Sequence, residues 1–215
     1  MYEDMHTSDE LDAIKKFEEE KSREKDSEEP EFEGVVYQPE EDTYLLCDAS
    51  DEFAFGNVLE LGCGSGFISV EMAKNGLNVT ACDINPDAII HTKKLAESEN
   101  VKVNVIESNL FESVADTFDT IIFNPPYLPE DKREPKGMMQ VATTGGESGY
   151  ELIESFFHEV HEYINKNGII LLLFSSLTNK DKVDEIISLH GYKSEIVREK
   201  QIFFETLYVY KIQRL

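Results

Sequence analysis

The sequence has no hydrophobic run long enough to cross a membrane. None of its apolar stretches approaches the roughly 20 residues that a transmembrane helix needs. The N-terminus is charged where a signal peptide would have an apolar core. These absences predict a cytoplasmic protein without a membrane partner.

Cysteine is scarce, and its positions form no pair. The sequence contains 3 cysteines, Cys47, Cys63 and Cys82, and no Cys-x-x-Cys motif. This pattern indicates neither a disulfide framework nor a zinc site. We therefore expect buried, reduced thiols and no bound metal.

Positive charge is also in short supply. The chain has 20 lysines and arginines against 44 aspartates and glutamates, which gives a net charge of −24. A nucleic-acid-binding protein needs a cationic surface to meet the phosphates. Lys132 and Arg133 come nearest to a basic patch, but acidic residues flank them. The composition therefore disfavours DNA or RNA as a substrate.

The acidic residues are dense in the N-terminal segment. Residues 1–34 are rich in aspartate and glutamate and poor in large apolar side chains. Such a segment buries too little apolar surface to offset the entropy of ordering, so we expect a disordered or loosely docked acidic tail. From residue 35 the composition is that of a globular protein, and we predict one folded domain over residues 35–215.

Within that domain, segments with strand patterns alternate with segments of helical spacing. Strands are predicted at 57–61, 78–82, 102–106, 118–123 and 168–174, helices at 40–50, 66–75, 86–98, 148–165 and 180–190, and a loop at 124–147. Two further strands, 192–199 and 203–211, close the chain, and Phe203 and Phe204 are expected to pack within them. This order predicts an α/β fold with a seven-stranded, mostly parallel sheet, helices on both faces and an antiparallel C-terminal hairpin.

A glycine-rich turn follows the first predicted strand. The sequence Glu-Leu-Gly-Cys-Gly-Ser-Gly at 60–66 places Gly62, Gly64 and Gly66 where a ligand can approach the backbone closely. The spacing differs from the Gly-x-Gly-x-x-Gly of dinucleotide-binding folds. Glu60 would repel a phosphate but attract an ammonium group, which favours an amino-acid-bearing cofactor such as S-adenosylmethionine. A strand–helix turn without a ligand is the alternative.

Two later strand ends extend the candidate cofactor site. Asp83 ends the second predicted strand, where an acidic residue about 20 positions beyond a glycine turn typically accepts hydrogen bonds from ribose hydroxyls. The alternative is an N-cap of the helix that includes Pro86. After the third strand, Asn109 would bond the exocyclic amine of an adenine, and Leu110 would pack against its ring.

The fourth predicted strand ends in Asn124-Pro125-Pro126-Tyr127. Two prolines cannot continue a sheet ladder because neither has an N–H to donate, so the chain must turn there. The turn lies at the edge where open α/β sheets bind ligands, and it offers a side-chain amide, backbone carbonyls and an aromatic ring. Carbonyls accept the hydrogens of a planar NH2 group, and a ring stacks on its face. The motif therefore predicts such a group as the acceptor in a transfer reaction.

Together these segments resemble a known family. The motifs at 60–66, 83–86 and 124–127 are similar to those of class I S-adenosylmethionine-dependent methyltransferases of the HemK-like, NPPY type. Residues 37–43 (Tyr-Gln-Pro-Glu-Glu-Asp-Thr) and 142–149 (Ala-Thr-Thr-Gly-Gly-Glu-Ser-Gly) resemble segments of its eukaryotic and archaeal branch. The resemblance leaves out the acidic tail and implies the Rossmann-like fold of that class.

The branch methylates the side-chain amide nitrogen (N5) of the glutamine in the Gly-Gly-Gln motif of class I peptide-chain release factors. The resemblance thus implies a role in translation termination, and a small zinc-binding activator protein that forms a heterodimer with the enzyme. It implies cofactor contacts from Thr43, Glu60, Gly62, Asp83, Asn109 and Asn124, and a glutamine held by Asn124, Pro125, Pro126 and Tyr127. Relatives often have Asp at the position of Asn109. The amide oxygen of Asn109 is neutral and is therefore a weaker acceptor than a carboxylate.

The residues leave other acceptors open. The exocyclic amine of adenine (N6) or guanine (N2) in DNA or RNA is also planar, although the net charge and the lack of a target-recognition domain weigh against it. A protein lysine amine is neither planar nor limited to two donors, so it fits less well. A non-catalytic cofactor-binding scaffold is a further alternative, against which the intact Glu60 and Asn124 argue.

Overall fold

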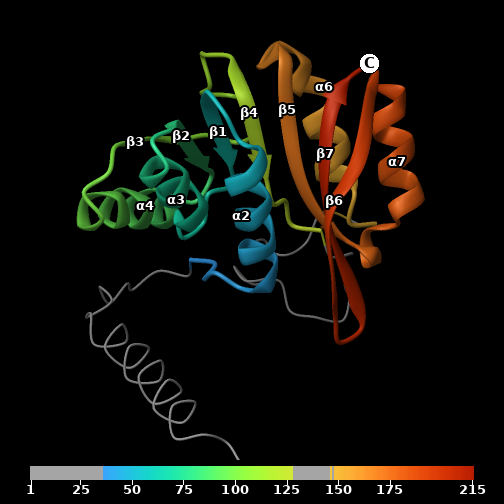
Figure 1. Ribbon diagram of the computed structural model, residues 1–215, viewed down its shortest axis with the longest axis horizontal. Coiled ribbons are helices and arrows are strands. Elements are labelled where there is room, and N and C mark those ends of the chain that lie inside the picture. The colour runs from blue at the N-terminus through green and yellow to red at the C-terminus, as the bar shows by residue number, and fades with distance from the viewer. Residues whose placement is uncertain (1–35, 128–145, 147) are drawn as a thin grey trace, which may run out of the picture. The chain divides into compact units, whose positions relative to one another are not determined.

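The computed structural model describes residues 36–127, 146 and 148–215. They form a seven-stranded sheet in the order β3-β2-β1-β4-β5-β7-β6 (Figure 1). The strands are β1 (Asn57–Leu61), β2 (Asn78–Asp83), β3 (Val103–Glu107), β4 (Phe118–Phe123), β5 (Ile164–Ser175), β6 (Tyr192–Ile202) and β7 (Glu205–Arg214). The predicted tail at 1–34 and most of the predicted loop at 124–147 lie outside the described residues.

The directions of the strands follow from their connections. β1 is parallel to β2 and β4, β2 is parallel to β3, and β4 is parallel to β5, whereas β7 is antiparallel to both β5 and β6. The helices are α2 (Glu41–Phe53), α3 (Phe67–Lys74), α4 (Pro86–Ser98), α6 (Glu151–Glu159) and α7 (Lys180–Leu189). Two neighbouring parallel strands need a crossover connection, usually a helix, because the chain must return to the edge where the first strand began before it starts the second. The predicted α/β fold with an antiparallel C-terminal hairpin is confirmed.

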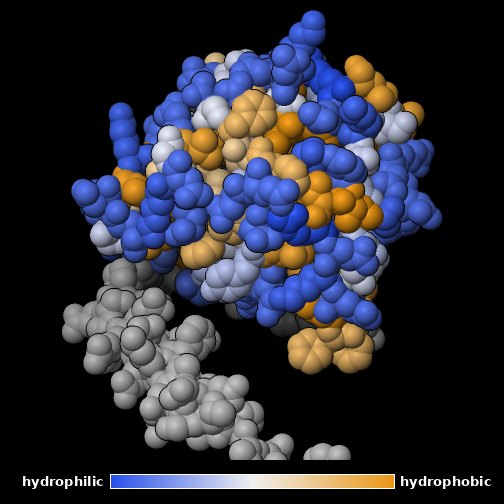
Figure 2. All heavy atoms as spheres, in the orientation of Figure 1, coloured by the Kyte–Doolittle hydropathy of each residue, from blue (hydrophilic) through white to orange (hydrophobic). Residues whose placement is uncertain are grey.

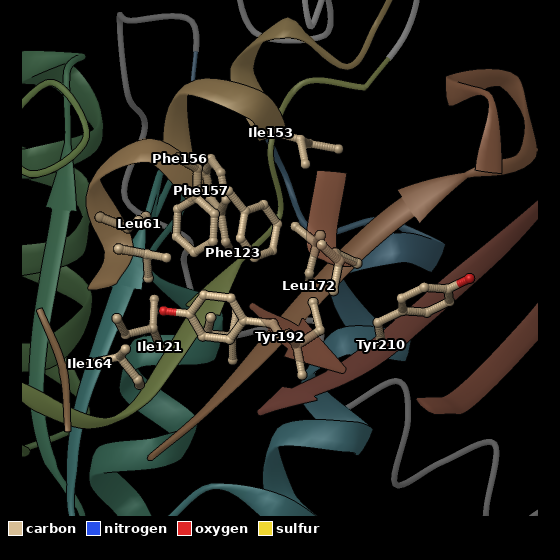
Figure 3. Packing of buried hydrophobic residues seen from close by; sticks show 14 of the residues in the cluster. Leu61, Ile121, Phe123, Ile153, Phe156, Phe157, Ile164, Leu172, Tyr192 and Tyr210 are labelled. Atoms are coloured by element: carbon tan, nitrogen blue, oxygen red, sulfur yellow. The ribbon is translucent and has the colours of Figure 1, made fainter. Parts of the chain in front are cut away.

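Apolar side chains form a core on each face of the sheet. The first core packs Phe156 and Phe157 of α6, together with α7, against the strands (Figure 3). The second joins α2 and α3 to the opposite face. Neighbours on one strand alternate between the two, with Ile121 in the first core and Ile122 in the second. Each fully buried side chain of this size contributes about 1.5–3 kcal/mol relative to an exposed one.

The helix predicted at 148–165 is shorter in the structure. α6 ends at Glu159, a 3-10 turn covers Val160–Glu162, and β5 already begins at Ile164. The apolar positions keep their helical spacing as far as Ile164, which is why the sequence predicts a longer helix. However, Ile164 pairs with Phe118 of β4, whose N–H donates to the carbonyl of Tyr163 at 2.8 Å. Pairing with β4 thus overrides the local pattern.

The prediction that Phe203 and Phe204 pack within the terminal strands is wrong. They form the tip of the β6–β7 hairpin and are 98% and 97% exposed. The pairing of β5 with β7 stops at Ser175 and Leu207, so no neighbouring strand of the described residues extends beside the tip. Hydrophobic side chains accordingly protrude from this tip at the lower edge of the space-filling view (Figure 2).

The cysteines Cys47, Cys63 and Cys82 are buried and unpaired, as expected. Within residues 36–127, 146 and 148–215, no group of three or more His, Cys, Asp or Glu is placed to hold a metal ion. Nor does any helix in these ranges combine the length and the hydrophobicity that crossing a bilayer requires.

Candidate active site

Three neighbouring strands bring their ends together at one edge of the sheet. The last residue of β1 pairs with Cys82 of β2 on one side and with Phe123 of β4 on the other. Gly62, Asp83 and Asn124 follow these three positions directly. The strand order reverses between β1 and β4, and such a switch point is where open α/β sheets form a ligand crevice. The predicted cofactor residues therefore lie beside the predicted acceptor turn.

The glycine turn between β1 and α3 uses its glycines for different purposes. Gly62 has a φ of +66°, and a Cβ added to it would meet no atom of the described residues within 4 Å, so open space lies beside its backbone. At Gly66, with a φ of +79°, an added Cβ would lie 2.6 Å from Oγ1 of Thr92 in α4. Gly62 thus leaves room for a ligand, whereas Gly66 lets α3 and α4 pack closely.

Asp83 is fixed at the end of β2 by backbone donors. Its carboxylate accepts hydrogen bonds from the N–H of Gly64 at 2.9 Å and from the N–H of Asn85 at 2.8 Å. Burial raises the pKa of Asp83, and these backbone hydrogen bonds oppose that effect. The N-cap of α4 is Asn85, whose side chain accepts from the N–H of Asp87 at 3.0 Å, so the reading of Asp83 as that cap is wrong.

Glu60 is a buried carboxyl group in the middle strand. It is 5% exposed, and one of its oxygens accepts a hydrogen bond from the hydroxyl of Ser69. Burial raises the pKa of Glu60 to about 8, and the hydrogen bonds from Ser69 only partly oppose this shift. In the free protein at neutral pH the group is therefore mainly protonated. A cation beside it would favour the ionised form.

The side chain of Asn124 is oriented by Asp42 of α2. Its Nδ2 donates to Oδ2 of Asp42 at 3.0 Å. A carboxylate can only accept, so the NH2 of Asn124 must face Asp42 and its Oδ1 must face away. Among the described residues, this buried Oδ1 has no hydrogen-bond partner. The site thus contains an oriented carbonyl acceptor that is ready for an incoming N–H.

Asp42 itself is held by donors from two further residues, Tyr37 and Thr43. The hydroxyl of Tyr37 donates to its Oδ2 at 3.0 Å, and the N–H of Thr43 donates to its Oδ1 at 2.6 Å. Thr43 in turn accepts from the N–H of Glu40 at 3.4 Å through its hydroxyl. Sequence reasoning singled out Thr43 but missed Asp42. Asp42 is visible as a carboxylate in the same sequence motif. Its hydrogen-bond partner, Asn124, lies 82 positions away and cannot be identified from the sequence.

The acceptor side of the site opens into a cavity of about 320 Å³. Tyr37 and Tyr127 contribute aromatic rings to its wall, and the hairpin tip contributes Phe203. The carbonyl of Tyr127 accepts from the hydroxyl of Thr178 at 2.9 Å, which fixes the end of the Asn-Pro-Pro-Tyr turn. Burial and the nearby Asp42 raise the pKa of Tyr127, so its hydroxyl stays neutral.

The predicted adenine residues follow β3 on the cofactor side. Asp83 pairs with Glu107, which places Asn109 just beyond the same edge. The exposed Asn109 donates from Nδ2 to Glu112 at 3.1 Å, so its Oδ1 is directed away from that carboxylate. Leu110 has a φ of +45° and packs against the first core. Both residues stand at the predicted strand end.

Comparisons with known proteins identify relatives of this chain. The family model described as "Methyltransferase small domain" matches residues 38–203. The chain is 38% identical to a putative protein N5-glutamine methyltransferase of Methanocaldococcus jannaschii, over 84% of this chain and 92% of that relative. It is 29% identical to methyltransferase HEMK2 of Homo sapiens, over 83% of this chain and 90% of the human protein.

A solved structure gives the same result. The chain superposes with a TM-score of 0.67 and 27% identity on one chain in the structure of the E. cuniculi Mtq2–Trm112 complex, which is responsible for methylation of the translation termination factor eRF1. The match covers 84% of this chain and 99% of that one. The chain therefore belongs to the methyltransferase small-domain family, in the branch of the protein N5-glutamine methyltransferases.

Proposed function

We propose that the chain transfers a methyl group from S-adenosylmethionine to the side-chain amide nitrogen of the glutamine in the Gly-Gly-Gln motif of a class I peptide-chain release factor. The observation that carries this proposal is the buried Oδ1 of Asn124, which has no hydrogen-bond partner in the part of the chain that the structure describes and which Asp42 orients away from itself. Relatives named as release factor or protein N5-glutamine methyltransferases support the choice of substrate.

The residues at the sheet edge fit the proposed cofactor. Open space beside Gly62 admits a ligand against the backbone. The Glu60 carboxyl can ionise to pair with the ammonium group, and Asp83 ends β2 with a carboxylate that can accept from ribose hydroxyls. Asn109 and Leu110 would hold the adenine. Thr43, Gly64 and Gly66 complete the proposed set, with Gly66 acting through helix packing.

In the proposed mechanism, the protein positions a poor nucleophile. The bound cofactor supplies an electrophilic methyl group on a positively charged sulfur. An amide nitrogen attacks weakly because its lone pair is delocalised, so Oδ1 of Asn124 and the carbonyl of Pro125 would each accept a hydrogen bond from one of its N–H groups. The methylated nitrogen would then release one of its two protons to water. Pro126 fixes the turn, and Tyr127 would stack on the amide plane. Orientation of this kind can lower a barrier by several kcal/mol, and carbonyl dipoles favour the positive charge that develops on nitrogen.

We further propose a heterodimer with a small zinc-binding activator in the cytoplasm. The solved Mtq2–Trm112 complex supports the presence of a partner protein. A nucleobase amine would fit the same planar acceptor site, but the carboxylates around the cavity disfavour an approaching phosphate backbone.

The test is methyl transfer from labelled cofactor to a purified release factor, with and without the activator. We expect label on the wild-type release factor and none on its Gly-Gly-Ala variant. An oligonucleotide containing adenine and guanine serves as the competing substrate. Equal labelling of the two release factors, or preferential labelling of the oligonucleotide, would overturn the proposed function.

A further inference from the structure

The tip of the β6–β7 hairpin carries two phenylalanines, a residue type that is unfavourable both in a tight turn and in contact with water. Ile202 pairs with Glu205, which leaves Phe203 and Phe204 as a two-residue turn. Such turns favour glycine, asparagine and aspartate, because they require positive φ angles. Phe203 has a φ of +24°, and both rings are almost fully exposed. The hairpin gains nothing from aromatic side chains at these positions.

This tip stands beside the acceptor side of the active site. β6 and β7 continue to pair beyond Leu207, where β5 ends at Ser175, so the hairpin projects past the edge of the sheet. That is the carboxyl edge of the parallel strands, where Asn124 also lies. Ile202 and Phe203 line the same cavity as Tyr127. Phe203 of the exposed pair therefore borders a cavity that Tyr127 of the proposed acceptor turn also lines.

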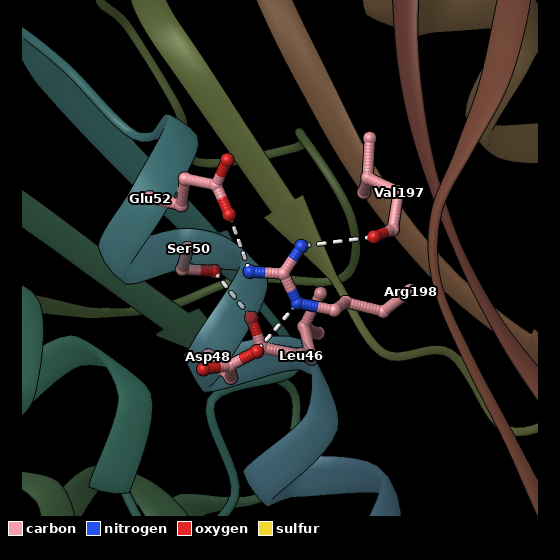
Figure 4. A network of polar contacts seen from close by, with 6 residues as sticks. All are labelled: Leu46, Asp48, Ser50, Glu52, Val197 and Arg198. Atoms are coloured by element: carbon pink, nitrogen blue, oxygen red, sulfur yellow. Dashed lines mark hydrogen bonds and ion pairs between the residues drawn. The ribbon is translucent and has the colours of Figure 1, made fainter.

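Ion pairs hold the hairpin against α2. Arg198 of β6 contacts Asp48 and Glu52 of α2, at 2.5 Å each (Figure 4). Nearer the tip, Lys200 forms an ion pair with Glu41 of the same helix. Since Asp42 on α2 also orients Asn124, one helix positions both the tip and the acceptor amide.

The charge of the cavity indicates what docks there. Glu40, Glu41, Asp42 and Glu205 line it, and no lysine or arginine does so among the described residues. The buried Oε2 of Glu205 has no hydrogen-bond partner within the same part of the chain. A carboxylate oxygen in this state is stabilised by a cationic donor. The surface thus combines an exposed aromatic pair with several carboxylates, of which Glu41 is paired with Lys200 while Oε2 of Glu205 has no partner among the described residues.

We propose, resting on the function proposed above, that this hairpin tip docks the acceptor protein. Phe203 and Phe204 pack against an apolar side chain of the segment that flanks the target glutamine. A lysine or arginine of that segment reaches the carboxylate of Glu205. The occupant is therefore the substrate's own basic and apolar flanking segment, and the tip determines affinity for the protein rather than the chemistry at Asn124.

The test measures KM and kcat for a purified release factor with the full chain and its activator. The variants are the double substitution Phe203→Ser/Phe204→Ser and the single substitution Glu205→Gln. Leu189→Ser is the matched control, because Leu189 is 73% exposed and ends α7 near the opposite end of the hairpin. Cofactor affinity by calorimetry and thermal unfolding accompany each variant.

We expect the double variant to raise KM for the release factor about tenfold or more, as the loss of an aromatic anchor does. Glu205→Gln should raise KM for the release factor and make KM less dependent on salt. Leu189→Ser should keep the wild-type KM, and every variant should keep the wild-type affinity for the cofactor. KM within about twofold of wild type for the double variant, in a protein that still labels the release factor, would overturn the docking proposal alone. Failure of the wild type to label the release factor would overturn the proposed function and this inference together.

Discussion

Asp42 and Asn124 lie 82 positions apart in the sequence and are joined by a hydrogen bond of 3.0 Å from Nδ2 of Asn124 to Oδ2 of Asp42. The bond settles which way the Asn124 amide faces, since a carboxylate cannot donate. Oδ1 of Asn124 is then presented on the opposite side. Orientation of the acceptor amide thus depends on a residue in another element.

Asp42→Asn should lower turnover without a comparable loss of cofactor affinity. An asparagine at position 42 can donate as well as accept, so both orientations of the Asn124 amide become available. We expect kcat to fall about 10–100-fold, the range seen when an orienting partner is removed. Single-turnover labelling of a release factor measures the effect. Tyr37→Phe removes one donor to Asp42 and should cost less; an equal or larger loss would contradict this account.

Gly62→Ala and Gly76→Ala form a matched pair that separates strain from ligand binding. Both glycines have positive φ angles, +66° and +82°, and at either one an added Cβ meets no atom within 4 Å in the described part of the chain. Each substitution should lower the unfolding free energy by about 1–2 kcal/mol because of its left-handed backbone. Only Gly62→Ala should also lower the affinity for S-adenosylmethionine measured by calorimetry. Equal affinities would remove Gly62 from the cofactor site.

The buried carboxyl of Glu60 should make stability depend on pH. Its pKa rises from the ordinary 4.5 to about 8, so between these values the folded protein holds a proton that the unfolded chain has released. The unfolding free energy of the cofactor-free protein should therefore fall as pH rises from about 4.5 to about 8. Denaturant titrations across this range should show that Glu60→Gln loses this component. An identical pH profile in the variant would refute it.

Glu60 should also release its proton when the cofactor binds. The ammonium group of the cofactor favours the ionised form of Glu60, whereas in the free protein at pH 7 this carboxyl group is mainly protonated. Binding should therefore release about one proton. Calorimetry in buffers of different ionisation enthalpy measures the number directly. Glu60→Gln should abolish the release. Buffer-independent heats in the wild type would exclude an ion pair between Glu60 and the ammonium group.

Asp83→Ala should impair both stability and cofactor binding. The substitution leaves the N–H groups of Gly64 and Asn85 without their acceptor, at a cost of about 1–3 kcal/mol in unfolding free energy. Loss of the carboxylate should also weaken cofactor binding, measured by calorimetry at a temperature where the variant is folded. Unchanged affinity there would refute the ribose role and leave Asp83 with the backbone contacts alone.

The strands could be predicted because burial on both faces leaves apolar runs, as at 118–123, whose ends are marked by Gly or by Asn-Pro-Pro. Their order in the sheet depends on long-range pairing, which these runs do not encode. The register also explains why Gly62, Asp83 and Asn124 meet, since each follows a strand that ends at the same edge. The helical spacing of apolar residues gave a wrong helix boundary where long-range strand pairing determined the structure. At Ile164 the helical pattern continues, but the backbone joins β4 instead.

Two features of the site had no local signal. The bond between Asp42 and Asn124 depends on how α2 docks on the sheet, which spacing within either motif does not encode. The exposure of Phe203 and Phe204 depends on where β5 ends relative to the hairpin, and apolar residues between two strands otherwise indicate packing. Both are consequences of tertiary arrangement, and both bear on the acceptor side of the site.

The most direct test of the central claim is the rate of methyl transfer to the Gly-Gly-Gln glutamine by Asn124→Ala, located by mass spectrometry of the release-factor peptide. Asn104→Ala, on an exposed position of β3, is the control. We expect a loss on the order of 100-fold or more for Asn124→Ala, as when one preorganised polar group is removed, with wild-type folding and cofactor affinity. Near-wild-type transfer by Asn124→Ala would contradict the account.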